Sequence, residues 1–151
     1  MYSVIIPTLW KCDRLVLTLE ELNSHHLVGE ILLFDNTPNQ TPITHLEKVN
    51  HILEGRNTYV TAPWNKGARM AKYDRLLVLN DDNWFDLSLL NTLHDLITPT
   101  IGMIGMAEEN HTENWSKWPN IVGIEPINNR NGGYGCVFFI HKDSWIENNP
   151  G

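Results

Sequence analysis

Short apolar runs recur along the chain at intervals that suit the strands of a sheet. Five of them are dominated by Val, Ile, Leu and Phe or similar residues, at 2–6, 28–34, 76–79, 101–106 and 136–140. Apolar runs of this length without strict polar alternation are typical of parallel strands covered on both faces. Pro7 follows the first run, and we expect it to end that strand because proline cannot donate to a ladder.

Stretches with helical periodicity lie between these runs. Four leucines predict a helix from an N-cap at Asp13 to about His25, and Leu87, Leu90, Leu93 and Leu96 predict another at 86–97. Shorter candidates are helices at 42–49, 62–72 and 141–147, and strands at 51–53, 58–60 and 121–124. The alternation predicts an α/β fold with a mostly parallel central sheet and helices on both faces.

Two adjacent carboxylates follow the apolar run at 76–79, within the sequence Asn80-Asp81-Asp82-Asn83. Ligands of open α/β sheets bind beyond the carboxyl ends of the strands. Oxygen donors suit Mg²⁺ or Mn²⁺ rather than zinc, and a cation would relieve the repulsion between the carboxylates. The alternative is that Asp81 and Asp82 merely end a strand and that Asp86 caps the next helix.

Two further polar clusters have the same double interpretation. The first is Asp35-Asn36-Thr37-Pro38, which follows the run at 28–34. It either contacts a ligand or forms an ordinary Asx turn. The second cluster lies where we expect a helix to begin and consists of Asn65-Lys66-Gly67 and Arg69. It either binds an anion or is simply a solvated helix start.

Composition narrows the class of protein. The chain has 151 residues, a formal net charge of −7 and 42% hydrophobic residues, which predicts one globular domain of ordinary size. The negative charge argues against nucleic acid as a partner. No run approaches the roughly 20 apolar residues that span a bilayer, so we expect no integral membrane segment. With two cysteines far apart and no signal-like start, a cytoplasmic location is expected.

Four segments in order resemble the GT-A fold nucleotide-sugar glycosyltransferases, closest to glycosyltransferase family 2. They are SVIIPT at 3–8, EILLFDNT at 30–37, NKGARMAKYDRLLVLNDDN at 65–83 and GGYGCVFFIHKDSW at 132–145. Each motif is weak alone, but their order covers nearly the whole chain and makes the set specific. The resemblance implies a single Rossmann-like GT-A domain over residues 1–151, which binds a nucleotide sugar.

The resemblance also implies roles for individual residues. The donor contacts would be Pro7, Thr8 and Leu9 at the base or ribose, Asp35 or Asn36 at the uracil, and Asn65 and Arg69 at the ribose or diphosphate. In the DXD-type motif, Asp81 and Asp82 would hold Mn²⁺ or Mg²⁺, with Asp82 the preferred direct ligand. The family often has a second acid where this chain has Asn36.

The implied reaction is inverting transfer from a UDP-sugar to a hydroxyl of an unidentified sugar or glycan acceptor. The family's catalytic base lies beyond the segment matching 132–145, and this chain ends before that point, so we expect a minimal or truncated version. Candidate bases without a matching motif are Glu108, Glu109, Glu113 and Asp143. The alternatives are a nucleotide-sugar-binding module without transfer and a donor hydrolase. A nucleotidyltransferase would want a Gly-rich phosphate loop after the first strand, which residues 8–11 do not form.

Overall fold

The computed structural model describes residues 1–38, 42–105 and 137–148. The described strands are β1 (Tyr2–Thr8), β2 (Val28–Asp35), β3 (Val49–Leu53), β4 (Arg75–Leu79), β5 (Ile104–Gly105) and β6 (Val137–His141). The described helices are α1 (Leu15–Ser24), α2 (Thr61–Met70), α3 (Leu89–Leu93) and α4 (Lys142–Asn148).

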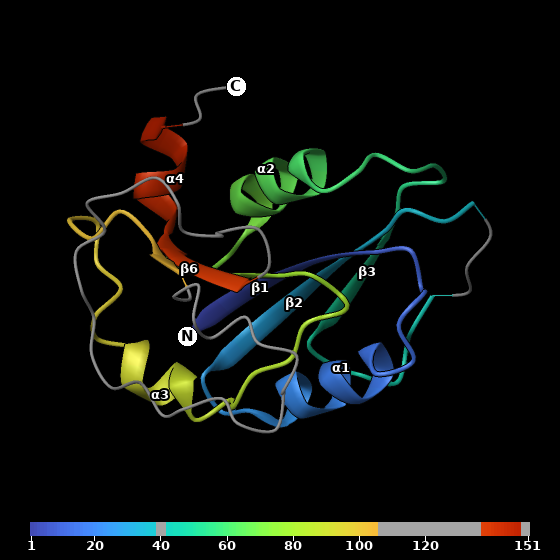
Figure 1. Cartoon of the computed structure of the whole chain (residues 1–151), viewed down its shortest axis with the longest axis horizontal. Coiled ribbons are helices and arrows are strands. Elements are labelled where there is room, and N and C mark those ends of the chain that lie inside the picture. Colours follow the sequence, from blue (N-terminus) through green and yellow to red (C-terminus); the bar gives the residue numbers. More distant parts are fainter. Residues whose placement is uncertain (39–41, 106–136, 149–151) are drawn as a thin grey trace.

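The described strands form one six-stranded sheet in the order β3-β2-β1-β4-β6-β5. The first four strands are mutually parallel, whereas β6 pairs antiparallel with both β4 and β5. In Figure 1, β1 and β2 run side by side through the middle of the molecule. The predicted α/β fold with a mostly parallel sheet is therefore confirmed, and the carboxyl ends of β1, β2, β3 and β4 share one edge.

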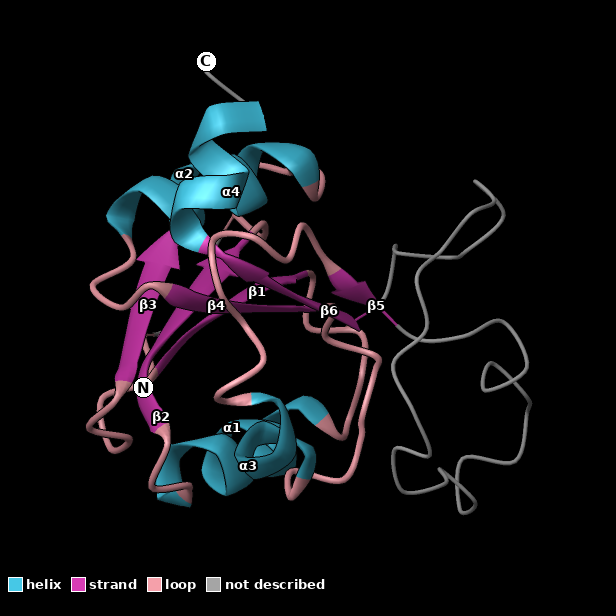
Figure 2. Ribbon diagram, turned by 90° about the vertical axis from the view of Figure 1, so that its left-hand side faces the viewer, coloured by secondary structure: helices cyan, strands magenta, loops and turns pink. Residues whose placement is uncertain are grey.

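Helices cover both faces of the sheet, with α2 and α4 on one side and α1 and α3 on the other (Figure 2). Successive strand residues point to opposite faces, so Ile5 joins the core under α2 while Val4 and Ile6 join the core over α1. Leu15 and Leu19 of α1 are fully buried, and burial of such a side chain contributes about 1.5–3 kcal/mol. Both faces of these strands are covered by helices, and this explains why their sequences are continuous apolar runs.

Close packing of α2 on β1 depends on Gly67. A Cβ at this position would lie 2.7 Å from Cγ2 of Ile5, which is well inside van der Waals contact. The missing side chain therefore lets the helix backbone rest directly on the strand. After α2, the backbone N–H of Lys72 donates to Glu30 Oε1 and that of Tyr73 to Ser3 Oγ, so the end of the helix is fixed near the starts of β1 and β2.

Two predicted elements are wrong. The helix expected at 42–49 is an irregular segment that enters β3 at Val49, held by a bond from the Lys48 backbone N–H to Asn23 Oδ1 at 3.0 Å. The strand expected at 58–60 is a turn, because Tyr59 has a left-handed φ of 59° that no strand accommodates. In both places long-range contacts override the local pattern.

Several boundaries also differ from the expected ones. Pro7 lies inside β1 and does not end it. At Pro7, β4 no longer pairs with β1, so the N–H that proline lacks costs less there. Arg14, not Asp13, precedes the first turn of α1. The strand expected at 101–106 is described only as β5.

Helix α3 is shorter than the predicted 86–97. Asp86 accepts the Ser88 backbone N–H at 2.9 Å, so it closes a turn before α3 rather than capping a long helix. Leu90 and Leu93 are buried in the core as their spacing predicts, whereas Leu96 is exposed and Ile97 occupies the next core position instead.

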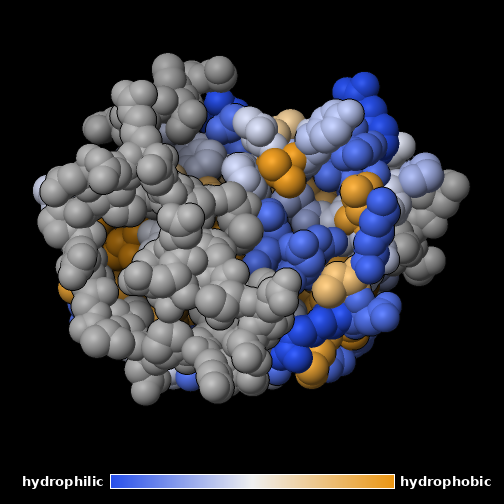
Figure 3. Space-filling view, in the orientation of Figure 1, coloured by the Kyte–Doolittle hydropathy of each residue, from blue (hydrophilic) through white to orange (hydrophobic). Residues whose placement is uncertain are grey.

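The strand expected at 121–124 lies outside the described residues. The described helices are all too short or too polar to cross a membrane. The face shown in Figure 3 is mostly hydrophilic over the described residues, with hydrophobic side chains scattered singly. That part of the surface therefore has no continuous apolar patch of the kind that marks a large docking interface.

Candidate functional site

The carboxyl ends of β1 and β4 are joined by Asp81. Its Oδ2 accepts the hydroxyl of Thr8 at 2.6 Å and the backbone N–H of Leu9 at 3.3 Å. Thr8 ends β1 and Asp81 lies two residues beyond β4, so two strands that are far apart in sequence meet at one carboxylate. This contact brings the polar groups at the ends of these two strands together at one edge of the sheet.

Asp82 lies beside this junction and is exposed to solvent. Asn83, which is only 6% exposed, donates its amide to Asp82 Oδ1 at 2.7 Å, and its backbone N–H bonds the Asn80 carbonyl at 3.2 Å. These bonds orient an accessible carboxylate on a closed turn.

The residues after Asn83 anchor the turn to the body of the domain. Phe85 is buried in the core over α1. The Trp84 indole N–H donates to Glu21 of α1 at 3.2 Å, and the Arg14 guanidinium lies 4.7 Å from the Trp84 ring centroid. The position of Asp82 is therefore fixed on both sides, by β4 and by α1.

Asp81 and Asp82 fit a hard divalent cation whose other ligands come from groups other than these two residues. Among the described residues, no group of three or more His, Cys, Asp and Glu side chains is placed to hold a metal. Mg²⁺ commonly binds through one or two carboxylates, with phosphate oxygens and water completing its shell. Of the two carboxylates, Asp82 is the more accessible, whereas Asp81 Oδ2 already accepts two hydrogen bonds from β1 and the loop that follows it.

Asp35 ends β2 and is completely buried with four hydrogen-bond donors around it. Oδ1 accepts the backbone N–H and the hydroxyl of Thr37 at 2.8 and 2.5 Å. Oδ2 accepts the indole N–H of Trp10 at 2.6 Å and Nε2 of His51 at 2.9 Å. Burial by itself would raise the pKa of Asp35, but the bonds from Thr37, Trp10 and His51 together hold that pKa below its ordinary value.

The ring of His51 is held in one tautomer. Its Nδ1 accepts the backbone N–H of Ile43 at 2.9 Å, so the ring proton is on Nε2 and points at Asp35. In this arrangement His51 is neutral, and the contact with Asp35 is a hydrogen bond rather than an ion pair. With both nitrogens engaged, His51 orients its neighbour and has no position left for accepting a substrate proton.

Asn36 fixes the approach to α2 at the same edge. Its Oδ1 accepts the backbone N–H and hydroxyl of Thr58 at 3.1 and 2.7 Å, and its Nδ2 donates to the Tyr59 carbonyl at 3.0 Å. These bonds hold the backbone of Tyr59, a residue that is 75% exposed, at the start of α2. The side chain of Asn36 is only 4% exposed and supports the backbone around it.

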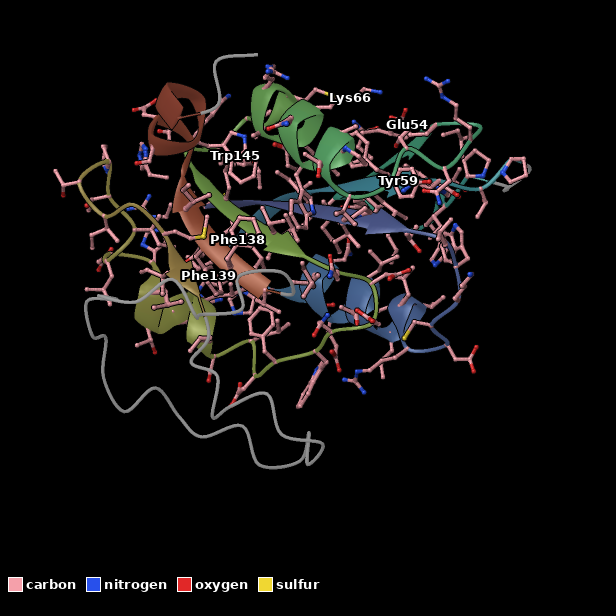
Figure 4. All side chains as sticks on the ribbon, turned by 45° about the horizontal axis from the view of Figure 1, so that its top comes forward. Glu54, Tyr59, Lys66, Phe138, Phe139 and Trp145 are labelled. Atoms are coloured by element: carbon pink, nitrogen blue, oxygen red, sulfur yellow. The ribbon has the colours of Figure 1, made fainter. Side chains whose placement is uncertain are left out.

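Asn65 and Arg69 belong to different turns of the helix that packs on β1. We expected the segment Asn65-Lys66-Gly67 to lie at the start of a helix. Instead, α2 begins at Thr61, so Asn65 and Arg69 both lie inside the helix. Asn65 Oδ1 accepts the indole N–H of Trp145 at 3.1 Å, and Trp145 packs on Phe138 as Figure 4 shows. Arg69 lies in the last turn of α2, toward the opposite edge of the sheet.

Asp143 also lies away from this edge. Strand β6 runs antiparallel to β4, so His141 pairs with Arg75 at the start of β4, and Asp143 follows His141 in α4. The structure therefore separates this candidate base from Asp81 and Asp82 by the length of β4. Glu108, Glu109 and Glu113 lie outside the described residues.

Sequence reasoning did not single out Trp10 or His51, although both contact Asp35. Trp10 is the second residue after β1, so an aromatic residue just beyond a buried strand was the available signal. His51 gave a weaker signal, as a polar residue within a short apolar strand.

The structure is similar in fold to solved structures of S. aureus TarS. A crystal structure of TarS 1-349 superposes with a TM-score of 0.67 at 14% identity, and the alignment covers 99% of this chain and 49% of that chain. A second TarS crystal structure gives a TM-score of 0.48 at 18% identity, with 63% of this chain and 19% of that chain covered. This chain thus spans about half of the first TarS chain.

No curated protein matches the sequence. A family model does match, and it covers residues 3–147, which include β1, the turn carrying Asp82 and β6. The family is described as "Glycosyl transferase family 2". A match over nearly the whole chain, together with the sheet order and the strand-end carboxylates, shows that this chain belongs to glycosyl transferase family 2.

Proposed function

We propose that the chain acts as a metal-dependent glycosyltransferase that transfers a sugar from a UDP-sugar to an acceptor hydroxyl with inversion. The observation that carries the proposal is the Asp81–Asp82 turn at the carboxyl end of β4, joined through Asp81 to Thr8 of β1. An exposed, oriented carboxylate at this edge of an open α/β sheet is placed to meet a ligand. Membership of the family supplies the reaction class.

The roles of the residues follow from their contacts. Asp82 would be the protein's direct ligand for Mn²⁺ or Mg²⁺, with Asn83 holding its carboxylate in place. Asp81 would act mainly by fixing the end of β1 against the turn that carries Asp82. When bound, the cation would neutralise charge on the diphosphate leaving group, which is a Lewis-acid contribution. A fixed turn suits this task because the geometry need not reorganise as charge develops.

The direct test is release of UDP from UDP-sugars, measured with Mn²⁺ or EDTA and with or without candidate acceptor sugars. We expect Asp82→Asn to fold normally and to lose about 100-fold or more of the metal-dependent rate, because the isostere removes one charge at the metal. Asp95→Asn is the matched control, since Asp95 has a 94% exposed side chain outside this edge.

The result separates the proposal from its two rivals. Acceleration of UDP release by an acceptor supports the transferase. If UDP is released slowly and no acceptor changes that rate, the protein is a donor hydrolase. Tight UDP binding without release under any condition would identify a binding module and overturn the enzyme proposal.

A further inference from the structure

Strand β3 forms an outer edge of the sheet, on the side away from β5 (Figure 2). In a parallel pair, alternate residues of a strand bond the neighbouring strand, and the residues between them turn their backbone groups away. The Ile31 N–H donates to the Lys48 carbonyl at 2.7 Å, and the Glu54 N–H donates to the Asp35 carbonyl at 2.9 Å. The even-numbered residues of β3 therefore bond β2, and its odd-numbered residues turn their N–H and C=O groups outward.

Most of these outward groups are unpaired. The Val49 N–H donates to the Leu46 carbonyl at 3.1 Å, which occupies the start of the edge. Within the part of the chain that the structure describes, the backbone N–H and C=O groups of His51 and Leu53 have no hydrogen-bond partner. The side chain of His51 is only 2% exposed although the residue as a whole is not buried, so its exposed part is the backbone. These groups are accessible to another strand.

The edge also lacks the features that usually prevent strand pairing. Proteins protect an edge strand with a proline, a lysine, a bulge or a very short length. The sequence of β3 is VNHIL, and its register with β2 is continuous. The opposite edge of the described sheet is β5, which has only two residues. Leu53 adds an apolar side chain to the β3 edge, since it is 49% exposed.

We propose that β3 is a self-association surface, where a second copy of this chain pairs antiparallel across a two-fold axis at His51. The N–H and C=O groups of His51 then bond those of the partner's His51, and each Leu53 N–H bonds the carbonyl of the partner's Val49. Every outward N–H of β3 is then paired, and the two sheets join into one. Leu53 lies opposite the partner's Val49, so an exposed apolar side chain gains an apolar neighbour.

The backbone selects this register over its neighbours. A two-fold axis at Val49 would need the N–H that Leu46 already occupies. An axis at Leu53 would pair His51 with Gly55, whose left-handed φ of 68° lies outside the extended conformation of a strand. The axis at His51 is the one that uses only extended residues with free groups.

Charges at the two ends of β3 favour the antiparallel direction. Glu47 precedes the strand and Arg56 follows it, and both are exposed. Neither has an ion pair within the described residues. An antiparallel pair places each Glu47 beside the partner's Arg56, whereas a parallel pair would bring like charges together.

The pairing leaves the candidate site open. Strands β1, β2, β3 and β4 are parallel, so the carboxyl ends of the two copies face in opposite directions and neither covers the other. The edge of a five-residue strand is smaller than a standard interface of about 800 Å² per partner, so we expect a dissociation constant in the micromolar range.

Sedimentation velocity of the full chain across micromolar concentrations tests the proposal. We expect wild type to show a monomer–dimer equilibrium. Leu53→Pro should abolish the dimer, because it removes an N–H that points away from β2 and because an edge strand accepts proline. Leu53→Val is the matched control at the same position, since it keeps the N–H and an apolar side chain and should still dimerise.

Charge reversal gives a second test that does not require the fold to accept proline. Glu47→Arg and Arg56→Glu each place like charges across the axis, so each should weaken the dimer about 2- to 30-fold. The double variant Glu47→Arg/Arg56→Glu restores unlike pairs and should recover most of the affinity. If Leu53→Pro does not fold, this rescue decides.

Amide hydrogen exchange at low and high protein concentration identifies the register. The amides of His51 and Leu53 should exchange rapidly in the monomer and become protected as the dimer forms. The amides of Asn50 and Ile52 bond β2 and should be protected at both concentrations. Protection of the Gly55 amide at high concentration would indicate an axis at Leu53 and overturn the proposed register.

Other outcomes would overturn the inference as a whole. Wild type might sediment as a monomer at every concentration, in which case no second copy occupies β3. A dimer that Leu53→Pro and both charge reversals leave unchanged is formed by another surface. All of these measurements are made without nucleotide or metal, so the proposed function is tested separately.

Discussion

At the scale of single residues, the ends of β1 and β4 depend on a few short contacts. Thr8 is 2% exposed, and its hydroxyl both donates to Asp81 and accepts the Trp10 backbone N–H. One side chain therefore orients both the Asp81 carboxylate and the backbone of Trp10, in the loop after β1. Such a doubly used buried group leaves two partners unsatisfied when it is removed.

We expect Thr8→Val to lower the free energy of unfolding by about 1–3 kcal/mol, because it retains the shape and removes the hydroxyl. Chemical denaturation measures the change. Thr8→Ser keeps the hydroxyl and should lose less. Equal losses in both variants would mean that packing of the methyl group, and not the hydrogen bonds, stabilises this position.

The second residue-scale prediction concerns pH. Because the hydrogen bonds from Thr37, Trp10 and His51 outweigh burial, the folded pKa of Asp35 is below its ordinary value of 3.8. The carboxylate thus contributes stability that is fully present above the ordinary pKa and is lost as pH falls through the folded pKa. Wild type should be more stable than Asp35→Asn at neutral pH, and the gap should narrow below about pH 4. Thermal unfolding of both proteins across this range measures it, and a gap of constant size would contradict the linkage.

At the scale of elements, the strands were predictable and several connections were not. The runs that became β1, β2 and β4 are apolar because both faces of those strands are buried, so local composition carries the information. The segment at 42–49 has a helical pattern, but its conformation depends on bonds to Asn23 and His51 from other elements. Contacts of this kind are not visible in a local pattern.

The candidate site shows the same division. Asp81 and Asp82 were predictable because a polar cluster after a buried strand has a known place in an α/β sheet. The grouping of Trp10 and His51 around Asp35 was not, because it joins side chains from three segments that only the sheet order brings together. The separation of Asp143 from the site was also hidden, since it depends on the antiparallel direction of β6.

The contact of α2 with β1 gives an element-scale prediction. Alanine favours a helix interior over glycine by about 1 kcal/mol, but overpacking a core typically costs about 1–3 kcal/mol. The contact at 2.7 Å with Ile5 involves a buried strand residue that cannot move aside, so Gly67→Ala should destabilise the protein. Chemical denaturation should show the loss, whereas Gly102→Ala, where a Cβ meets nothing within 4 Å, should change stability little.

At the scale of the whole molecule, the proposed function predicts that metal and nucleotide stabilise the fold together. A ligand that binds only the folded state raises stability by mass action, by about 2.7 kcal/mol at 100 times its dissociation constant. We expect UDP with Mn²⁺ to raise the melting temperature and UDP with EDTA to raise it much less. Asp82→Asn should remove most of the difference between the two conditions, while an equal shift in both would remove the metal from the proposal.

The pairing of β4 with β6 has a consequence for how this chain behaves when it is partly unfolded. Leu79 pairs with Val137 and Arg75 with His141, so β6 reaches β4 only after a long stretch of chain has been placed. Contacts of such high sequence separation are slow to form, because the intervening chain must first be closed into a loop. When β6 is absent, Leu76-Leu77-Val78-Leu79 becomes an unprotected sheet edge, an apolar template for another chain. The strand that leads into Asp81 and Asp82 is thus also the point from which this domain would be expected to aggregate.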